Sequence, residues 1–116
     1  MDNMQNILPG TTLKILINLE CKSDPTVTLD TIEWSTEWFT GIYNEKTALK
    51  IEKNACVRVE DTVDGVTTVK YFAYVDTADM KAGKVSMRFL AKITDPDATD
   101  GVRKEYSEVT TDVVLS

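Results

Sequence analysis

Apolar residues alternate with polar ones in two stretches of the chain, and this alternation constrains the fold more than any other feature. Leucine and isoleucine occupy every second position from Leu13 to Leu19, and a similar alternation runs from Val85 to Ala91. Successive side chains of a β-strand point to opposite faces of a sheet, so a period of two places each apolar set on one face. Both stretches are therefore predicted to be strands with one buried face. Leu16 is the one apolar residue on the opposite face of the first stretch.

A turn signal between two β-branched residues predicts a hairpin in the middle of the chain. Asp64-Gly65 lies between Val63 and Val66. A two-residue type I′ turn needs positive φ at both central positions, and Asp-Gly supplies it. Counting back from the turn gives a register that pairs Val63 with Val66, Val57 with Phe72 and Cys56 with Ala73.

Further short segments with strand composition complete an all-β pattern. We expect strands over residues 31–39, 47–52, 56–61, 66–75 and 102–115, the last as an edge strand that is polar on one side. Residues 76–83 are expected to form one helical turn that crosses between two sheets and ends at Gly83. The predicted fold is an immunoglobulin-like β-sandwich of about seven antiparallel strands in a Greek-key arrangement. It forms a single domain over residues 1–116, with residues 1–8 flexible.

The segment from Thr31 to Phe39 is also compatible with a short helix. Asp30 and Glu33 resemble a capping box, and Trp34 and Trp38 are spaced as i,i+4 neighbours. Its threonine, tryptophan, isoleucine and phenylalanine content favours a strand. The two tryptophans are candidate platforms for sugar rings, although at least one is expected in the core, as is usual for a sandwich.

The absence of histidine excludes several classes of chemistry. The chain has 116 residues and no histidine, which removes Ser-His-Asp and Cys-His catalysis and most zinc sites. There are 13 basic and 19 acidic residues, so the formal net charge is −6. An acidic domain repels phosphate, and we expect no nucleic-acid or membrane partner. The scattered basic residues are interpreted as solvated strand faces; they are Lys81, Lys84, Arg88 and Lys92.

The N-terminal residues and the cysteines indicate in which cellular compartment the chain is expected. Residues 1–6 lack the basic and apolar regions of a signal peptide, so we expect a chain that is cytoplasmic as synthesised, unless a leader was removed. Cys21 and Cys56 permit one disulfide, but two thiols in a reducing compartment are the favoured interpretation.

Carboxylates are the only remaining candidates for chemistry. Asp95, Asp97 and Asp100 cluster in a loop that ends at Gly101, as a calcium site requires, but their spacing departs from the EF-hand pattern. We interpret this loop as a hairpin connection and expect neither a metal nor another cofactor. A pair for glycoside hydrolysis would have to come from Glu33, Glu37, Asp61 or Asp64, and nothing in the sequence brings two of them together. The chain is therefore not expected to be an enzyme.

Residues 74–85, with an Asp-Thr…Gly-Lys corner, and residues 93–105, with an Asp-Gly-x-Arg-x-Glu segment, carry a family resemblance. They resemble small immunoglobulin-like proteins of phages and prophages, including N-terminal β-sandwich domains of baseplate and tail-fibre proteins. Residues 8–15 fit the first strand of such domains. The sequence departs from a tyrosine-corner sandwich because Val85, and no tyrosine, stands near Gly83.

The resemblance implies a non-enzymatic structural or assembly module of a phage or prophage tail, baseplate or fibre. Its partners would be copies of itself or other virion subunits, bound through a strand edge or a sheet face. The alternative is a carbohydrate- or cell-surface-binding module that uses Trp34, Trp38 and the loops.

Overall fold

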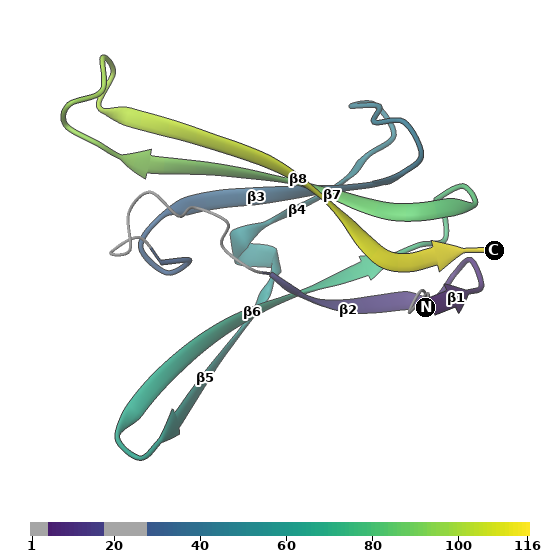
Figure 1. Cartoon of the computed structure of the whole chain (residues 1–116), viewed down its shortest axis with the longest axis horizontal. Helices are drawn as coiled ribbons and strands as arrows, with labels where there is room; N and C mark the ends of the chain where they lie inside the picture. The colour runs from purple at the N-terminus through teal and green to yellow at the C-terminus, as the bar shows by residue number, and fades with distance from the viewer. Residues whose placement is uncertain (1–4, 18–27) are drawn as a thin grey trace.

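The computed structural model describes residues 5–17 and 28–116, which form two β-sheets (Figure 1). The elements are β1 (Gln5–Ile7), β2 (Thr12–Ile17), β3 (Glu33–Thr40), β4 (Leu49–Glu52), the 3-10 helix η1 (Lys53–Ala55), β5 (Val57–Val63), β6 (Val66–Asp76), β7 (Gly83–Thr94) and β8 (Val102–Leu115). Within the described residues, no helix has the length and apolar character that crossing a bilayer requires.

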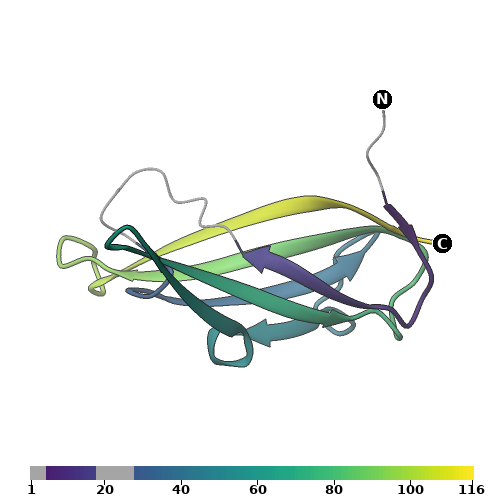
Figure 2. The same ribbon diagram turned by 90° about the horizontal axis from the view of Figure 1, so that it is seen from below.

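Five strands form one sheet and three form the other. The first has the order β1-β8-β7-β3-β4 and the second has the order β2-β6-β5. Figure 1 shows the two layers from the side, and Figure 2 shows the three-stranded sheet lying in front of the five-stranded one. The predicted all-β class is confirmed, but the pairing is not entirely antiparallel, because β1 runs parallel to β8 with Gln5 opposite Val113 and Ile7 opposite Leu115. Residues 5–7, expected to be flexible, thus form an additional strand, while residues 1–4 lie outside the described part of the chain.

The core lies between the sheets and is built from the faces that period-two alternation predicted. Val85, Met87, Phe89 and Ala91 are all buried on one face of β7. In β2, Ile17 is buried and Leu13 and Ile15 pack against the core, while Leu16 faces solvent. Leu19 lies outside the described residues.

The segment with both tryptophans is a strand, as its composition predicted. β3 pairs with β4 on one side and with β7 on the other, so it lies inside the five-stranded sheet. Ile32 precedes the strand and is buried with Trp34, Thr36 and Trp38. Pairing on both sides outweighs the capping-box signal at Asp30 and Glu33, because neighbours on both sides satisfy the backbone N–H and C=O groups that point to either side of the strand.

The hairpin register is confirmed over the length of β5. Val63 pairs with Val66 and Val57 pairs with Phe72 across the Asp64-Gly65 turn. Asp64 has φ 52° and Gly65 has φ 78°, as a type I′ turn demands. The expected pair of Cys56 with Ala73 is wrong. The ladder begins at Val57, and the Cys56 N–H instead donates to the carbonyl of Lys53 in the turn of η1.

Residues 77–82 cross from β6 in one sheet to β7 in the other, as predicted, but without a helical turn. The reason lies in the buried Thr77, whose hydroxyl donates to the carbonyl of Thr11 at 2.7 Å and accepts from the N–H of Gly10 at 3.1 Å. The Thr77 hydroxyl is therefore bonded to the connection between β1 and β2, and does not cap a helical turn of its own segment. Gly83 keeps its positive φ of 138°, but it opens β7 and does not end a helix.

Strand β8 is an edge strand over most of its length. Among residues 5–17 and 28–116, it pairs with β7 along one side, and the short strand β1 pairs with its other side at residues 113–115. The β7–β8 and β5–β6 hairpins diverge at the end of the molecule opposite the chain termini (Figure 1). The far part of each hairpin therefore stands clear of the other sheet.

Candidate functional site

The two tryptophans proposed as sugar platforms lie in the core. Trp38 is completely buried and Trp34 is 5% exposed. The indole N–H of Trp38 donates to the Thr36 hydroxyl at 2.8 Å, and the ring of Trp34 packs edge-on against Tyr71 and beside Phe89. The core interpretation is confirmed for both side chains, and burial leaves neither tryptophan the broad exposed ring surface on which a sugar would stack.

The acidic loop after β7 uses its carboxylates to fix its own backbone. Asp95 Oδ1 accepts the N–H of Asp97 at 3.0 Å, and Asp100 Oδ1 accepts the N–H of Val102 at 3.3 Å. The N–H of Asp95 donates to the carbonyl of Gly101, which closes the loop. These contacts are those of a hairpin connection. Across residues 5–17 and 28–116 no three acidic or cysteine side chains gather as a metal site would need.

The structure does not pair the acidic residues that were considered for glycoside hydrolysis. Glu33 and Glu37 lie on the outward face of β3, four residues apart along the strand. Asp61 and Asp64 lie on the exposed β5–β6 hairpin of the other sheet. Glu37 is buried and accepts a 2.8 Å hydrogen bond from the Tyr43 hydroxyl, which raises the pKa of Tyr43.

A groove of about 880 Å³ lies where the β4–β5 connection passes between the sheets. Its lining combines aromatic, basic and acidic side chains from both sheets: Glu33, Trp34, Ser35, Glu52, Lys53, Asn54, Cys56, Arg58, Tyr71, Leu90, Lys92 and Tyr106. The thiol of Cys56 is half-buried there, and burial raises its pKa, which disfavours the reactive thiolate. Cys21, the other half of the disulfide considered from the sequence, lies outside the described residues.

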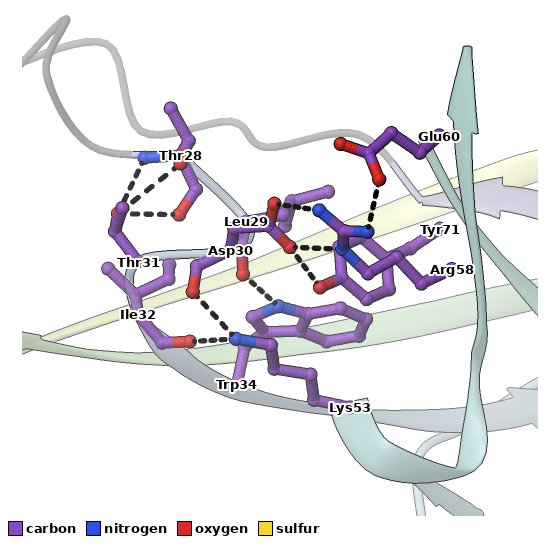
Figure 3. Close-up of polar contacts among 10 residues, drawn as sticks. All are labelled: Thr28, Leu29, Asp30, Thr31, Ile32, Trp34, Lys53, Arg58, Glu60 and Tyr71. Atoms are coloured by element: carbon purple, nitrogen blue, oxygen red, sulfur yellow. Dashed lines mark hydrogen bonds and ion pairs between the residues drawn. The ribbon is translucent and has the colours of Figure 1, made fainter. Parts of the chain in front are cut away.

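A polar cluster at one wall of the groove was not predicted from the sequence (Figure 3). Asp30 accepts two hydrogen bonds from Arg58, from Nε to Oδ1 at 2.9 Å and from Nη2 to Oδ2 at 2.8 Å. The Tyr71 hydroxyl donates to the same Oδ1 atom. Arg58 Nη1 also lies 3.4 Å from Glu60 Oε2. Paired contacts of this kind fix both the distance and the orientation of the guanidinium group.

The backbone around Asp30 is held by two further side chains. Lys53 Nζ donates to the carbonyls of Asp30 at 3.1 Å and Ile32 at 2.9 Å, and Trp34 Nε1 donates to the carbonyl of Leu29 at 3.0 Å (Figure 3). We call Asp30, Trp34, Lys53, Arg58 and Tyr71 the Asp30 cluster. It ties residues 29–32, which lead into β3, to the turn η1 and to the other sheet.

The electrostatics of the cluster favour its ionised form. Hydrogen bonds from Arg58 and then from Tyr71 hold the pKa of Asp30 well below its usual value of 3.8. The same carboxylate raises the pKa of Arg58, and burial together with Asp30 raises the pKa of Tyr71. Each charged group already has a partner within the chain, so the cluster is built to fasten the two sheets together and not to activate a nucleophile.

One signal could have pointed to part of this cluster. The hairpin register that pairs Val57 with Phe72 also places Arg58 opposite Tyr71 on the inward face. An arginine on the face of a core tyrosine needs an acidic partner. The sequence offered no means of selecting Asp30, which lies 28 positions before Arg58.

The outward face of the three-stranded sheet carries an apolar strip. Its members are Leu16, Val57, Val59, Phe72 and Tyr74, and this set is called the apolar strip below. Leu16, Phe72 and Val57 are cross-strand neighbours in one row. Leu16 is 41% exposed, Val57 44% and Tyr74 47%. Lys14 lies with its ammonium group 4.5 Å from the centre of the Phe72 ring at the margin of the strip.

The outward face of the five-stranded sheet is charged. One register row crosses it from Lys50 through Glu37 and Arg88 to Glu108, so that charges alternate in sign. Arg88 lies over the ring of Tyr43 at 3.5 Å from its centre, and its Nε is 3.3 Å from Glu108 Oε2. The two sheets therefore present different outer surfaces, one apolar and one ionic.

Comparison of the chain with protein-family models, curated proteins and solved structures finds no match.

Proposed function

We propose that this chain is a non-enzymatic assembly module that binds other protein subunits, and that it belongs to a phage or prophage tail, baseplate or fibre. The apolar strip is the observation that carries the proposal. A strip of exposed leucine, valine and tyrosine side chains around the half-buried Phe72 on one sheet face is typical of a surface that a partner covers. The resemblance of residues 74–85 and 93–105 to phage immunoglobulin-like proteins supplies the kind of particle.

The proposed partner of the strip is a neighbouring subunit of the particle with an apolar contact surface and an acidic margin. Tyr74 and Phe72 supply large apolar area with few rotatable bonds, as interface centres often do. Lys14 and Lys70 share the face with the strip, since they pair with Tyr74 and Val59. An acidic margin on the partner would complement these two ammonium groups.

The immunoglobulin-like Greek-key class is part of the proposal, and the strand order supports it. Strands B, E and D of such domains are adjacent in one sheet, and strands C, F and G are adjacent in the other, with C′ added in variable-type domains. The neighbouring strands β2, β6 and β5 correspond to the first set. The neighbouring strands β4, β3, β7 and β8 correspond to the second set together with C′. The buried tryptophans of β3 correspond to the tryptophan of strand C.

Incorporation into particles tests the proposal. Particles are induced in the organism that encodes the chain, purified on a density gradient and probed with an antibody to the chain. We expect the wild-type chain in the particle fraction and a Leu16→Glu/Val57→Glu variant only in the soluble fraction. The matched control is Ile42→Glu, which places a carboxylate on a loop residue that is 93% exposed and off the strip.

Two results would overturn the proposal. A wild-type chain that is absent from purified particles removes the assembly function. A Leu16→Glu/Val57→Glu chain that enters particles as well as the Ile42→Glu chain removes the apolar strip as the contact surface. Circular dichroism of both variants verifies that the exposed substitutions leave the fold intact, as expected for surface positions.

A further inference from the structure

We propose that two copies of the chain associate through the outward face of the three-stranded sheet, with the apolar strip of each copy covered by the tip of the β5–β6 hairpin of the other. This inference rests on the proposed assembly function and deepens it by naming a second copy as the subunit that covers the strip. The side chains involved lie on β2, β5 and β6, whose pairing fixes their relative positions.

The outward side chains of this sheet form rows across the strands, because directly paired residues point to the same face. From the hairpin turn inward, the rows are Val63 with Val66, Asp61 with Thr68, Val59 with Lys70, Val57 with Phe72 and Leu16, Tyr74 with Lys14, and Asp76 with Thr12. Each row is named below by its residue of β6. The Thr68 row separates the strip from the two valines at the hairpin tip.

The hairpin tip carries a second apolar surface on this face. Val63 and Val66 pair directly with each other, and we call them the tip valines. Val63 is 63% exposed and Val66 67%, a larger fraction than for any member of the strip. The hairpin stands clear of the five-stranded sheet at this end (Figure 1). The tip valines and the Phe72 row are therefore two apolar surfaces on one face, about 20 Å apart along β6.

A two-fold axis across the strands, between the Lys70 and Thr68 rows, brings these surfaces into contact. The axis lies in the plane between the two copies and reverses the strand direction, so each row faces the row of the second copy at the same distance from the axis. Val66 then faces Phe72 of the second copy, and Val63 faces Val57. Symmetry repeats both contacts, so both strips are covered. Aligned sheets that pack about 10 Å apart interdigitate their side chains in this way.

The same axis brings opposite charges together. The row of Lys70 faces the row that carries Asp61 of the second copy, twice by symmetry. Both residues are exposed, and across residues 5–17 and 28–116 neither of them makes an ion pair. Lys14 already lies over the Phe72 ring of its own chain, so the charge complementarity rests on Lys70 and Asp61. Complementary charges of this kind fix the register of a contact.

Other positions of the axis lose this match. An axis through the Thr68 row places Asp61 against itself, and an axis through the Lys70 row places Lys70 against itself. An axis through the Phe72 row brings Asp76 to Asp61, and an axis between the Lys70 and Phe72 rows sets the tip valines against Asp76. Like charges and buried unpaired charges both oppose association. Among these axes, only the one between the Lys70 and Thr68 rows joins apolar rows to each other and lysine to aspartate.

An unlike subunit is the competing occupant of the strip, and a tip valine separates the two cases. Val66→Glu changes a residue outside the strip, but in the dimer it brings a carboxylate against Phe72 of the second copy. We expect this variant to dimerise at least about tenfold more weakly in sedimentation equilibrium. The control Ile42→Glu, at a loop residue that is 93% exposed, should dimerise like the wild type. Equal dimerisation of the two variants would overturn the proposal.

Cross-linking reads the position of the axis. In a Cys21→Ser/Cys56→Ser background, Thr68→Cys places one thiol of each copy beside the axis, about 7 Å apart along the strands and within reach of a bismaleimide with a spacer of about 10 Å. The matched control Thr12→Cys lies on the same face, but its two thiols would be about 46 Å apart. We expect a covalent dimer from Thr68→Cys alone. Equal yields from both variants, or none from Thr68→Cys, would contradict the arrangement.

Charge reversal tests the contact between Lys70 and Asp61. Lys70→Glu and Asp61→Lys each turn two attractive contacts into two repulsive ones, so each should dimerise at least about tenfold more weakly, whereas Lys81→Glu, at an exposed residue of the β6–β7 connection, should not. An equimolar mixture of the two variants restores both contacts, and so does Lys70→Glu/Asp61→Lys in one chain. A mixture that associates no better than either variant alone refutes the pairing. Circular dichroism verifies that these exposed substitutions leave the fold intact.

Failure of this inference is distinct from failure of the assembly function. A wild-type chain that stays monomeric at about 1 mM, yet enters particles in a manner that depends on the strip, refutes the second copy as the partner and leaves the assembly function standing. A wild-type dimer that never enters particles refutes the assembly function and leaves the contact between the two copies standing.

Discussion

The buried hydroxyl of Thr36 bonds to the neighbouring strand β4 and to the completely buried Trp38, and its removal should have a measurable effect on stability. Thr36 Oγ1 donates to the carbonyl of Ile51 at 2.8 Å and accepts the indole N–H of Trp38 at 2.8 Å. Thr36 and Trp38 are completely buried. Thr36→Val keeps the shape of the side chain and removes both bonds, so the indole N–H loses its acceptor in the interior.

The expected loss of stability follows from these two bonds. The bond to Ile51 contributes about 1 kcal/mol, and a buried N–H without an acceptor costs about 1–3 kcal/mol. The methyl group that replaces the hydroxyl returns about 0.8 kcal/mol through apolar burial. We therefore expect Thr36→Val to lower the free energy of unfolding by about 2 kcal/mol.

A double-mutant cycle with Trp38→Phe isolates the contact between the two side chains. Phenylalanine has no N–H, so Thr36→Val should cost about 1 kcal/mol less in the Trp38→Phe background than in the wild type. Unfolding in urea, followed by circular dichroism, measures all four chains, and the fluorescence of Trp34 gives a second signal in the two chains that lack Trp38. A coupling energy near zero would show that the Thr36 hydroxyl does not hold the indole, and would undermine the assignment of Trp38 to the core.

Two further predictions concern the Asp30 cluster and the hairpin. Because the pKa of Asp30 is lowered, its carboxylate stabilises the fold fully above its ordinary pKa of 3.8, and this stabilisation is lost as the pH falls toward the folded-state pKa. The urea midpoint of Asp30→Asn should therefore lie below that of the wild type at pH 7 and approach it in acid; a difference that does not change with pH would contradict the ionised pair with Arg58. Gly65→Ala should lower the free energy of unfolding by about 1 kcal/mol, measured by thermal melting, because Gly65 has φ 78° and alanine is strained there. An unchanged melting temperature would mean that the turn has relaxed to another type.

The strands were predictable because their signals are local. Alternation identified the faces of β2 and β7, and the turn type at Asp64-Gly65 fixed the register of β5 against β6. The placement of Trp34 and Trp38 in the core followed from the same reasoning about β3. Each of these inferences depends on residues that lie close together in the sequence.

The remaining features depend on contacts between distant residues. With only three residues, β1 is too short to show a period, and its partner lies at the far end of the chain. The corner at Thr77 was predicted as a helical turn, since nothing local indicates that its hydroxyl bonds to Thr11, 66 positions earlier. The ion pair of Asp30 with Arg58 likewise joins a loop to a strand of the other sheet. Local patterns do not determine which of many acidic residues such a side chain meets.

The parallel pairing of β1 with β8 determines how the molecule would respond to tension. Gln5 lies opposite Val113 and Ile7 opposite Leu115, and the N–H of Ser116 donates to the carbonyl of Ile7. A pull on the chain before β1 and a pull on the chain after β8 would act in opposite directions along this pair. The bonds between the two strands would then share the load in shear, and would not open one after another from an end.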